Sequence, residues 1–306
     1  MLQKIIVICG PTGSGKTALS LKIAKGIDCE IVSADSRQVY RYLNIGTDKV
    51  SKKIRKEIPH HLIDIKNPDE KYTAGDFMRD ADAAIKQIFD KGLFPMVVGG
   101  TGFYIKSLLY GLSNIPPIPG KIRKNLRQEM KQKSNEKLFE ELKKVDPETA
   151  SDIHPNDKKK IIRFLEVYRH TGRAISEFWA DHIEKKRYND YTIYLKPDRN
   201  KLYEKINDRV NKMVERGLVD EVDKLLQMGY KPSDPGLNTP GYKEIISYFN
   251  GKYDLQRAVE LIKQHQRNYA KRQYTWFSGA SIDLTISPTN LNISNIINKL
   301  IQFLRS

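Results

Sequence analysis

Residues 4–17 read KIIVICGPTGSGKT and indicate the fold of this part of the chain. The stretch begins with a run of β-branched apolar residues at 5–8, which is typical of a buried parallel strand. A glycine-rich turn follows, and a helix is expected after it. The turn fits the phosphate-binding pattern G-x-x-x-x-G-K-[ST] over Gly10, Pro11, Thr12, Gly13, Ser14, Gly15, Lys16 and Thr17. This order of strand, turn and helix predicts a phosphate-binding loop.

The chemistry of this loop follows from its residue types. Glycines let backbone N–H groups curve around phosphate oxygens at the start of a helix, where the helix dipole favours anions. Lys16 is expected to neutralise phosphate charge, and the Thr17 hydroxyl to reach a Mg²⁺ ion. The alternative is a glycine turn that binds nothing, which the flanking strand and helix disfavour. The loop alone does not indicate whether the phosphates belong to a nucleotide or to another pyrophosphate.

Two further predicted strands bring polar side chains towards the loop. Glu30–Ala34 reads as a strand that ends at Asp35, and Met96–Val98 reads as a strand followed by a glycine-rich turn that contains Thr101. Ligands of open parallel sheets bind at the carboxyl edge of the strands. We therefore expect Lys16, Asp35 and Thr101 to lie at the same edge. The alternative role for Asp35 is an Asx turn that only leads the chain away from the strand.

A shorter apolar stretch at His61–Ile65 is also expected to form a strand. The adjacent His60 and His61 suggest a metal site. A strand would point their two rings to opposite faces, and no third ligand stands nearby at helical spacing. We therefore disfavour a metal at these histidines.

Three prolines in SNIPPIPG, at 113–120, interrupt the alternation of strands and helices. Residues 115–190 are charged and mostly helical in pattern, and Pro155 is expected in the first turn of one helix. We predict an α/β fold, a P-loop NTPase-like parallel sheet flanked by helices. Residues 1–114 plus 191–306 would form this catalytic core, and residues 115–190 an inserted all-helical subdomain.

The composition agrees with a globular protein, since 39% of the residues are apolar. No apolar run is long enough to cross a membrane, and no secretory h-region precedes the loop, so we expect a cytoplasmic protein that contacts no membrane. Cys9 and Cys29 fall in or beside predicted strands. They are expected to be core residues and not a disulfide or a metal pair.

Basic residues exceed acidic ones by 53 to 37, which gives a net charge of +16 spread through the folded segments. Such a charge suits a polyanion-binding surface, or it is simply a lysine-rich solvated surface, and charge alone does not separate the two. The predicted helix at 255–277 is more specific evidence for nucleic-acid binding. Lys263, Arg267, Lys271 and Tyr274 recur on one side of it, a pattern that could follow a phosphate backbone and stack a base.

Taken together, motifs along nearly the whole chain resemble one family, the tRNA dimethylallyltransferases. The motifs are GPTGSGKT at 10–17, SADSRQVY at 33–40, NIGTDK at 44–49, VGGTGFY at 98–104, HPND at 154–157, GYKE at 241–244 and AKRQYTWF at 270–277. Several of these segments are not expected in ordinary kinases.

The resemblance implies a reaction. A dimethylallyl group would pass from dimethylallyl diphosphate to the N6 amine of the adenosine 3′-adjacent to the anticodon of a tRNA, and diphosphate would leave. Mg²⁺ is the implied cofactor, and the anticodon stem-loop the implied partner. The loop would then bind the diphosphate as a leaving group. By stabilising the charge that grows on the diphosphate, the loop would act by electrostatic catalysis of the oxyanion-hole kind. We expect a monomer.

The resemblance also implies roles for individual residues. Asp35 would accept the proton from the N6 amine, Arg209 would clamp the departing diphosphate, and Thr101 would contact the diphosphate or the target nucleotide. Residues expected to read a flipped adenosine are Asp35, Ser36, Arg37 and Gln38. Residues expected to hold the stem-loop through its phosphates are Arg123, Lys159, Lys160, Arg163, Arg267 and Lys271.

Two other classes of function stay open at this point. A P-loop kinase of a small metabolite would use Asp35 as a base on a hydroxyl group, but it would also need a second acidic strand end and an adenine pocket. An RNA-binding module without catalysis would have no need for Asp35, Thr101 and Arg209 around a phosphate loop.

Overall fold

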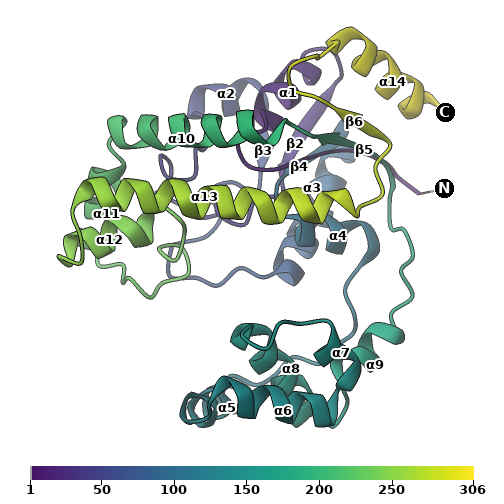
Figure 1. Cartoon of the computed structure of the whole chain (residues 1–306). Helices are drawn as coiled ribbons and strands as arrows, with labels where there is room; N and C mark the ends of the chain where they lie inside the picture. Colours follow the sequence, from purple (N-terminus) through teal and green to yellow (C-terminus); the bar gives the residue numbers. More distant parts are fainter. Residues whose placement is uncertain (1) are drawn as a thin grey trace. The chain divides into compact units, whose positions relative to one another are not determined.

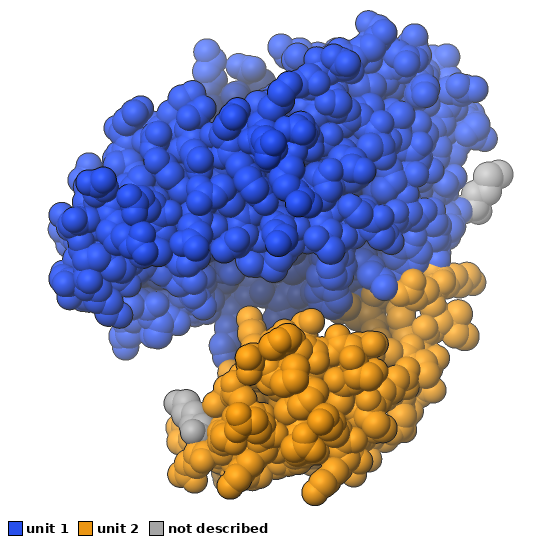
Figure 2. All heavy atoms as spheres, viewed as in Figure 1, with its two compact units in different colours: residues 1–110, 186–306 blue, residues 111–185 orange. Residues whose placement is uncertain are grey.

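The computed structural model describes residues 2–306, with the side chains at 122, 126 and 131 left out of the description. The chain forms two compact units, shown in blue and orange in Figure 2. The first unit contains the chain up to Tyr110 together with Lys186–Ser306, and the second is Gly111–Lys185. The sequence placed the insertion at 115–190.

The first unit contains a parallel sheet, as the sequence predicts. Its strand order is β3-β2-β4-β1-β5-β6, and all five neighbouring pairs are parallel. The strands are β1 (Lys4–Cys9), β2 (Cys29–Ser33), β3 (His60–His61), β4 (Phe94–Gly99), β5 (Asn189–Leu195) and β6 (Leu284–Ile286).

Figure 1 labels the helices of this unit. They are α1 (Lys16–Ile23), α2 (Lys52–Glu57), α3 (Ala74–Asp90), α4 (Gly102–Tyr110), α10 (Arg199–Glu215), α11 (Leu218–Gln227), α12 (Tyr242–Phe249), α13 (Leu255–Ser278) and α14 (Ile293–Arg305). In the part of the chain that is described, no helix combines the length and the apolar character needed to cross a membrane.

Alternate side chains of β1 belong to two different cores, because successive residues of a strand point to opposite faces. Ile5, Val7 and Cys9 pack in the core that includes residues of α3 and α4. Ile6 and Ile8 pack in the core that includes residues of α1 and α14. Both faces of the sheet are covered, which explains why its strands read as continuous apolar runs. Cys9 and Cys29 are buried free thiols, as expected.

The strand order brings three connecting segments together. Strand β4 lies between β2 and β1, so the carboxyl ends of these three strands are neighbours. The segments that leave them begin at Gly10, Ala34 and Gly100. After β4 the chain continues on the other side of β1, in β5 and β6. This reversal marks the position where open α/β sheets bind their ligands.

One strand prediction was too long. The sequence suggested a strand over His61–Ile65, whereas β3 contains only His60–His61. Leu62 and Asp64 have φ values of 63° and 59°, in the left-handed region, which an extended strand cannot accommodate. The turn buries the Leu62 side chain and lets the Asp64 carboxylate accept a hydrogen bond from Lys49 Nζ at 2.7 Å.

The longest helix links two cores of the first unit. Ala258 and Ile262, near the start of α13, pack with residues of α11 and α12. Phe277, near its end, packs in the sheet core with α3 and α4. Helices α10 and α13 lie side by side between these points (Figure 1), with Ile206 and Ala270 packed together. This arrangement carries the middle of α13 past the carboxyl edge of the sheet.

The second unit is helical, with its own apolar core. Its helices are α5 (Gly120–Gln132), α6 (Asn135–Val145), α7 (Pro147–Ser151), α8 (Lys158–Thr171) and α9 (Ile175–Ala180). The expectation that Pro155 lies in the first turn of a helix was wrong. Helix α8 begins at Lys158, because the Asp157 side chain caps it by accepting a hydrogen bond from the Lys160 N–H at 3.2 Å.

Candidate active site

The glycine-rich loop joins β1 directly to α1, so the N-terminus of a helix faces the loop. Gly13 and Gly15 have φ values of 79° and 94°, which other residues rarely adopt. A side chain at Gly10 would also come within 2.7 Å of the Leu195 carbonyl oxygen. The glycines of the pattern are therefore required by the backbone of this loop.

Lys16 folds back over the loop. Its Nζ donates hydrogen bonds to the carbonyl oxygens of Gly10 at 2.9 Å and Pro11 at 2.8 Å. Desolvation lowers the pKa of Lys16 to about 8, although the Asp35 carboxylate acts in the opposite direction. The Ser14 hydroxyl is buried and has no hydrogen-bond partner. A cation in a desolvated loop and an unpaired donor are both groups that a phosphate would satisfy.

Asp35 follows β2, and its two carboxylate oxygens have different surroundings. Oδ1 accepts hydrogen bonds from the backbone N–H groups of Arg37 at 2.8 Å and Gln38 at 3.3 Å. Oδ2 has no hydrogen-bond partner among the described residues. The Asx turn considered for Asp35 is therefore present, but it uses one oxygen and leaves the other available.

Two small cavities meet at Asp35. One is lined by Asp35 together with Lys16 and Thr17. The other is lined by Asp35 together with Thr12 and Arg209. The carboxylate thus lies between the phosphate-binding loop and a guanidinium group from another helix, all within the first unit.

Thr101 follows β4 and is tied to the Asp35 segment. Its Oγ1 accepts a hydrogen bond from the Ser36 N–H at 3.1 Å, and its own N–H donates to the Ala34 carbonyl at 3.2 Å. Tyr269 of α13 lies next to it. Burial raises the pKa of Tyr269, and a hydrogen bond with the Thr101 side chain acts in the opposite direction. Lys16, Asp35 and Thr101 therefore do share one edge of the sheet.

Arg209 reaches the same edge from α10. Its Nη2 donates to Gln266 Oε1 at 2.9 Å, and its Nη1 lies 3.7 Å from Asp48 Oδ2. Its Nε is buried without a partner. Desolvation lowers the pKa of Arg209, with Asp48 and Asp35 acting in the opposite direction. The guanidinium keeps a free donor beside the cavity, as an anion-binding arginine requires.

The sequence analysis missed Gln273, which joins the phosphate-binding loop to the Thr101 turn. Its Oε1 accepts a hydrogen bond from the Thr12 N–H, and its Nε2 donates to the Gly100 carbonyl, both at 2.8 Å. Gln266 and Gln273 are both buried on α13, seven positions apart, which is about two helical turns. Two amides on the buried side of an amphipathic helix were the signal that could have revealed them.

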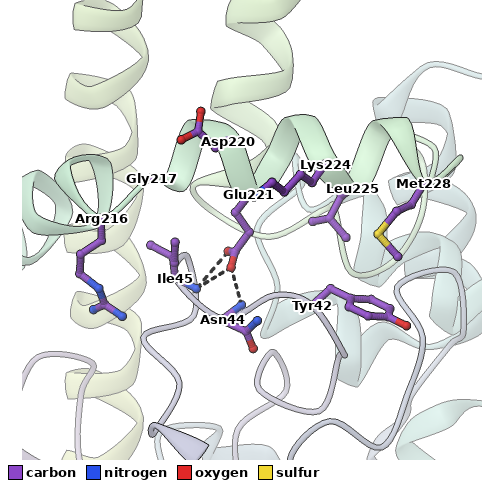
Figure 3. Close-up of a pocket in the computed structure, with 10 residues that line it drawn as sticks. All are labelled: Tyr42, Asn44, Ile45, Arg216, Gly217, Asp220, Glu221, Lys224, Leu225 and Met228. Carbon is purple, nitrogen blue, oxygen red and sulfur yellow. Dashed lines mark hydrogen bonds between the residues drawn. The ribbon is translucent and has the colours of Figure 1, made fainter.

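Glu221 fixes a second loop that borders the site. Its carboxylate accepts hydrogen bonds from the backbone N–H groups of Asn44, Ile45 and Gly46 at 2.9–3.1 Å, and from the Tyr242 hydroxyl at 2.6 Å. Figure 3 shows the carboxylate pointing from α11 to this loop. The same loop continues to Thr47, which lines the Arg209 cavity, and to Asp48, which contacts Arg209.

Replacing Glu221 by alanine should lower the free energy of unfolding by about 1–3 kcal/mol, because several backbone donors lose their acceptor. Urea unfolding followed by circular dichroism measures this loss. Asp220→Ala is the matched control, since the neighbouring Asp220 is exposed and points away from the loop in Figure 3. Equal destabilisation by both substitutions would contradict a specific role for Glu221.

Residues expected to bind nucleic acid on α13 have different surroundings. Lys271 is exposed. Arg267 donates to Asn207 Oδ1 at 2.6 Å. Tyr274 is half-buried, and Lys196 and Arg199 lie 5.9 and 5.5 Å from its ring centroid. Its role in stacking a base stays a prediction.

The remaining expected nucleic-acid contacts belong to the second unit. Arg123 and Arg163 point to the buried carboxylate of Glu166, with N···O distances of 3.4 and 4.0 Å. Burial lowers the pKa of Arg163. Lys159 and Lys160 are exposed. The two arginines are thus engaged in the structure of their own unit, while the two lysines face solvent.

The residues around the loop fit a magnesium ion that would arrive with phosphates. Among the residues that the structure describes, no group of three or more His, Cys, Asp or Glu side chains is placed to hold a metal. Thr17, Ser33 and Asp35, which carry oxygen donors, instead line one cavity beside Lys16. Mg²⁺ usually takes one or two protein oxygens and completes its shell with phosphates and water.

The sheet, the loop and the charged groups around it define a protein of the P-loop α/β class. Sequence comparison is more specific. The profile described as IPP transferase matches residues 38–280, and that described as isopentenyl transferase matches residues 3–60. A tRNA dimethylallyltransferase 2 of Geotalea uraniireducens is 46% identical over 98% of this chain and 97% of its own length. A tRNA dimethylallyltransferase of Thermotoga neapolitana is 46% identical over 90% of this chain and 89% of its own length.

Solved structures agree with this comparison. A tRNA isopentenylpyrophosphate transferase of Bacillus halodurans matches with a TM-score of 0.74 at 35% identity, covering 99% of this chain and 97% of its own. A eukaryotic dimethylallyltransferase acting on tRNA matches with a TM-score of 0.82 at 29% identity. This match covers 98% of this chain and 80% of the other chain. The chain belongs to the tRNA dimethylallyltransferase family, which is a family of transferases.

Proposed function

We propose that this protein transfers a dimethylallyl group from dimethylallyl diphosphate to N6 of the adenosine 3′-adjacent to the anticodon in tRNA. The bond between the allylic carbon and the diphosphate oxygen breaks, and a bond from that carbon to N6 forms. The N6 proton passes to the protein, and diphosphate leaves. The observation that supports this most is the position of Asp35, which lines one cavity together with Lys16 and another together with Arg209.

The two cations have complementary roles in this reaction. Negative charge grows on the diphosphate as the carbon–oxygen bond breaks, so groups that bind the leaving diphosphate more strongly lower the barrier. Lys16 and the Ser14 hydroxyl act from the loop, and Arg209 acts from α10. The buried Arg209 Nε without a partner and the unpaired Ser14 hydroxyl supply the donors. Thr17 would hold a Mg²⁺ ion that arrives with the diphosphate, and the ion would supply further charge neutralisation.

Asp35 acts as the proton acceptor. Oδ1 is held by two backbone N–H groups, so the carboxylate cannot rotate freely. Oδ2 is directed to the substrate amine and accepts its proton as the nitrogen gains positive charge. Thr101 holds the neighbouring Ser36 N–H and thereby fixes the segment that carries Asp35.

Recognition of tRNA involves both units. Ser36, Arg37 and Gln38, with Asp35 and Thr101, read the adenosine once it has left its stack. Phosphates of the stem-loop are bound by Arg267 and Lys271 of the first unit and by Arg123, Lys159, Lys160 and Arg163 of the second. Gly111–Lys185 is accordingly proposed as the tRNA-binding unit, and the remainder as the catalytic core. The monomeric state and the cytoplasmic location stay predictions.

A labelling assay tests the proposed function. Incubation with radiolabelled dimethylallyl diphosphate, Mg²⁺ and unmodified tRNA should label one adenosine beside the anticodon, as nuclease digestion and chromatography would reveal. Excess chelator should stop the reaction. A stem-loop RNA with inosine at that position is the matched control, since inosine lacks the exocyclic amine. ATP consumption without labelling of RNA would favour the kinase alternative instead.

A further inference from the structure

Two large aromatic side chains are exposed next to the active site. Phe103 of α4 is 50% exposed and Trp276 of α13 is 45% exposed. Their ring centroids are 6.4 Å apart at an interplanar angle of 84°. We refer to this pair as the aromatic platform. Exposed apolar surface made by adjacent large side chains marks binding sites more often than single exposed residues do.

The aromatic platform is continuous with the segment that carries Asp35. A Cβ atom at Gly102 would lie 2.1 Å from the Trp276 ring, so the indole rests directly on this glycine. Gly102 follows Thr101, whose hydroxyl accepts the Ser36 N–H. A ligand on the platform would therefore lie beside a nucleotide that contacts Asp35 and Thr101.

Charge around the platform is positive. A surface depression beside Trp276 is lined by Asn268, Lys271, Arg272 and Thr275. Lys271 and Arg272 are exposed, and neither forms an ion pair with any residue that the structure describes. Arg272 lies 5.7 Å from the ring centroid of Tyr269, which holds its guanidinium close to the site. Aromatic faces flanked by free cations are the chemistry that binds single-stranded nucleic acid.

We propose that the aromatic platform stacks an unpaired RNA base adjacent to the nucleotide that enters the active site, while Lys271 and Arg272 bind the phosphates beside that base. This inference rests on the proposed function. It assigns the role of the stacking surface to Trp276 and Phe103, which are more exposed than the half-buried Tyr274. The platform explains how a nucleotide is held out of its stack, since its neighbour gains a new stacking partner.

Tryptophan fluorescence tests the inference without catalysis. The chain contains two tryptophans, and Trp179 lies in the second unit, so Trp179→Phe leaves Trp276 as the only tryptophan. Titration of this variant with an anticodon stem-loop RNA, in the absence of dimethylallyl diphosphate, should give a saturable decrease in emission. The same RNA with abasic sites on both sides of the target adenosine should lose most of this decrease. An unchanged response to the abasic RNA would overturn the inference.

Kinetics supply the second readout. Trp276→Ala should raise KM for the RNA on the order of tenfold, while KM for dimethylallyl diphosphate stays unchanged. Trp276→Phe should restore most of the loss, because it keeps an aromatic face. Phe249→Ala is the matched control, since Phe249 is 40% exposed on α12, away from the platform. Circular dichroism confirms that each variant is folded.

The outcomes separate the two hypotheses. Transfer to RNA by the unmodified protein with no change of KM in Trp276→Ala would overturn the platform and leave the proposed function intact. Absence of transfer to any RNA would contradict the proposed function. The fluorescence titration would still decide whether an RNA base stacks on Trp276.

Discussion

Asp35→Asn should lower the turnover of prenyl transfer by about 10²–10⁴-fold, the usual contribution of a general base. The substitution is nearly isosteric, and the asparagine carbonyl oxygen can still accept the N–H groups of Arg37 and Gln38 that Oδ1 accepts now. The turn should therefore survive, and only the acceptor for the N6 proton should be lost. Single-turnover assays with enzyme in excess over labelled RNA measure the rate of the chemical step.

A binding measurement completes the Asp35 experiment. The dissociation constant for unmodified stem-loop RNA should change little, because most of the affinity comes from phosphate contacts and asparagine keeps the shape of the side chain beside the adenosine. Asp28→Asn is the matched control, since Asp28 is exposed just before β2 on the same segment. Losses of turnover and of RNA affinity by the same factor would show that Asp35 positions RNA and is not the base.

The part of this site that the sequence predicts follows from local order. The run at 5–8, the glycine pattern and the helix after it determine one another within a few residues of chain. Asp35 and Thr101 could be added because the carboxyl ends of parallel strands meet at one edge, whatever the detailed packing. Fold class and the central residues of the site were therefore within reach of the sequence.

The sequence did not predict the contacts between segments that are distant along the chain. Gln273 joins Thr12 to Gly100, and Glu221 accepts three backbone N–H groups of a loop far from it in the chain. The local sequence patterns of α11 and α13 do not indicate which backbone groups form hydrogen bonds with these side chains. Such contacts depend on the packing of whole helices, which periodicity does not determine.

The wrong predictions have a related cause. The sequence at His61–Ile65 is apolar enough for a strand, but β3 ends at His61. The turn that follows is stabilised by tertiary contacts, such as the hydrogen bond from Lys49 to Asp64. Pro155 was expected in the first turn of a helix, but α8 begins at Lys158, where the Asp157 side chain caps it. In both cases a local pattern was correct as a tendency, and a turn or a cap moved the boundary of the element.

Lys16→Met should lower the turnover by about 10²–10³-fold, the loss typical of one electrostatic group at a charge that develops in the transition state. The Lys16 ammonium is desolvated, and its pKa is lowered to about 8, so the fold gains little from the cation itself. Methionine removes the charge while it keeps an unbranched side chain. The unfolding midpoint should therefore stay close to that of the unmodified protein.

The charge of the diphosphate determines whether Lys16→Met changes turnover or KM more strongly. This charge is greatest after the carbon–oxygen bond has broken, so the effect on turnover should exceed the effect on KM for dimethylallyl diphosphate. Arg209 remains in the neighbouring cavity and should keep part of the substrate affinity. Lys22→Met is the matched control, because Lys22 is exposed on the same helix. A rise in KM without a loss of turnover would mean that Lys16 binds the substrate and its transition state equally.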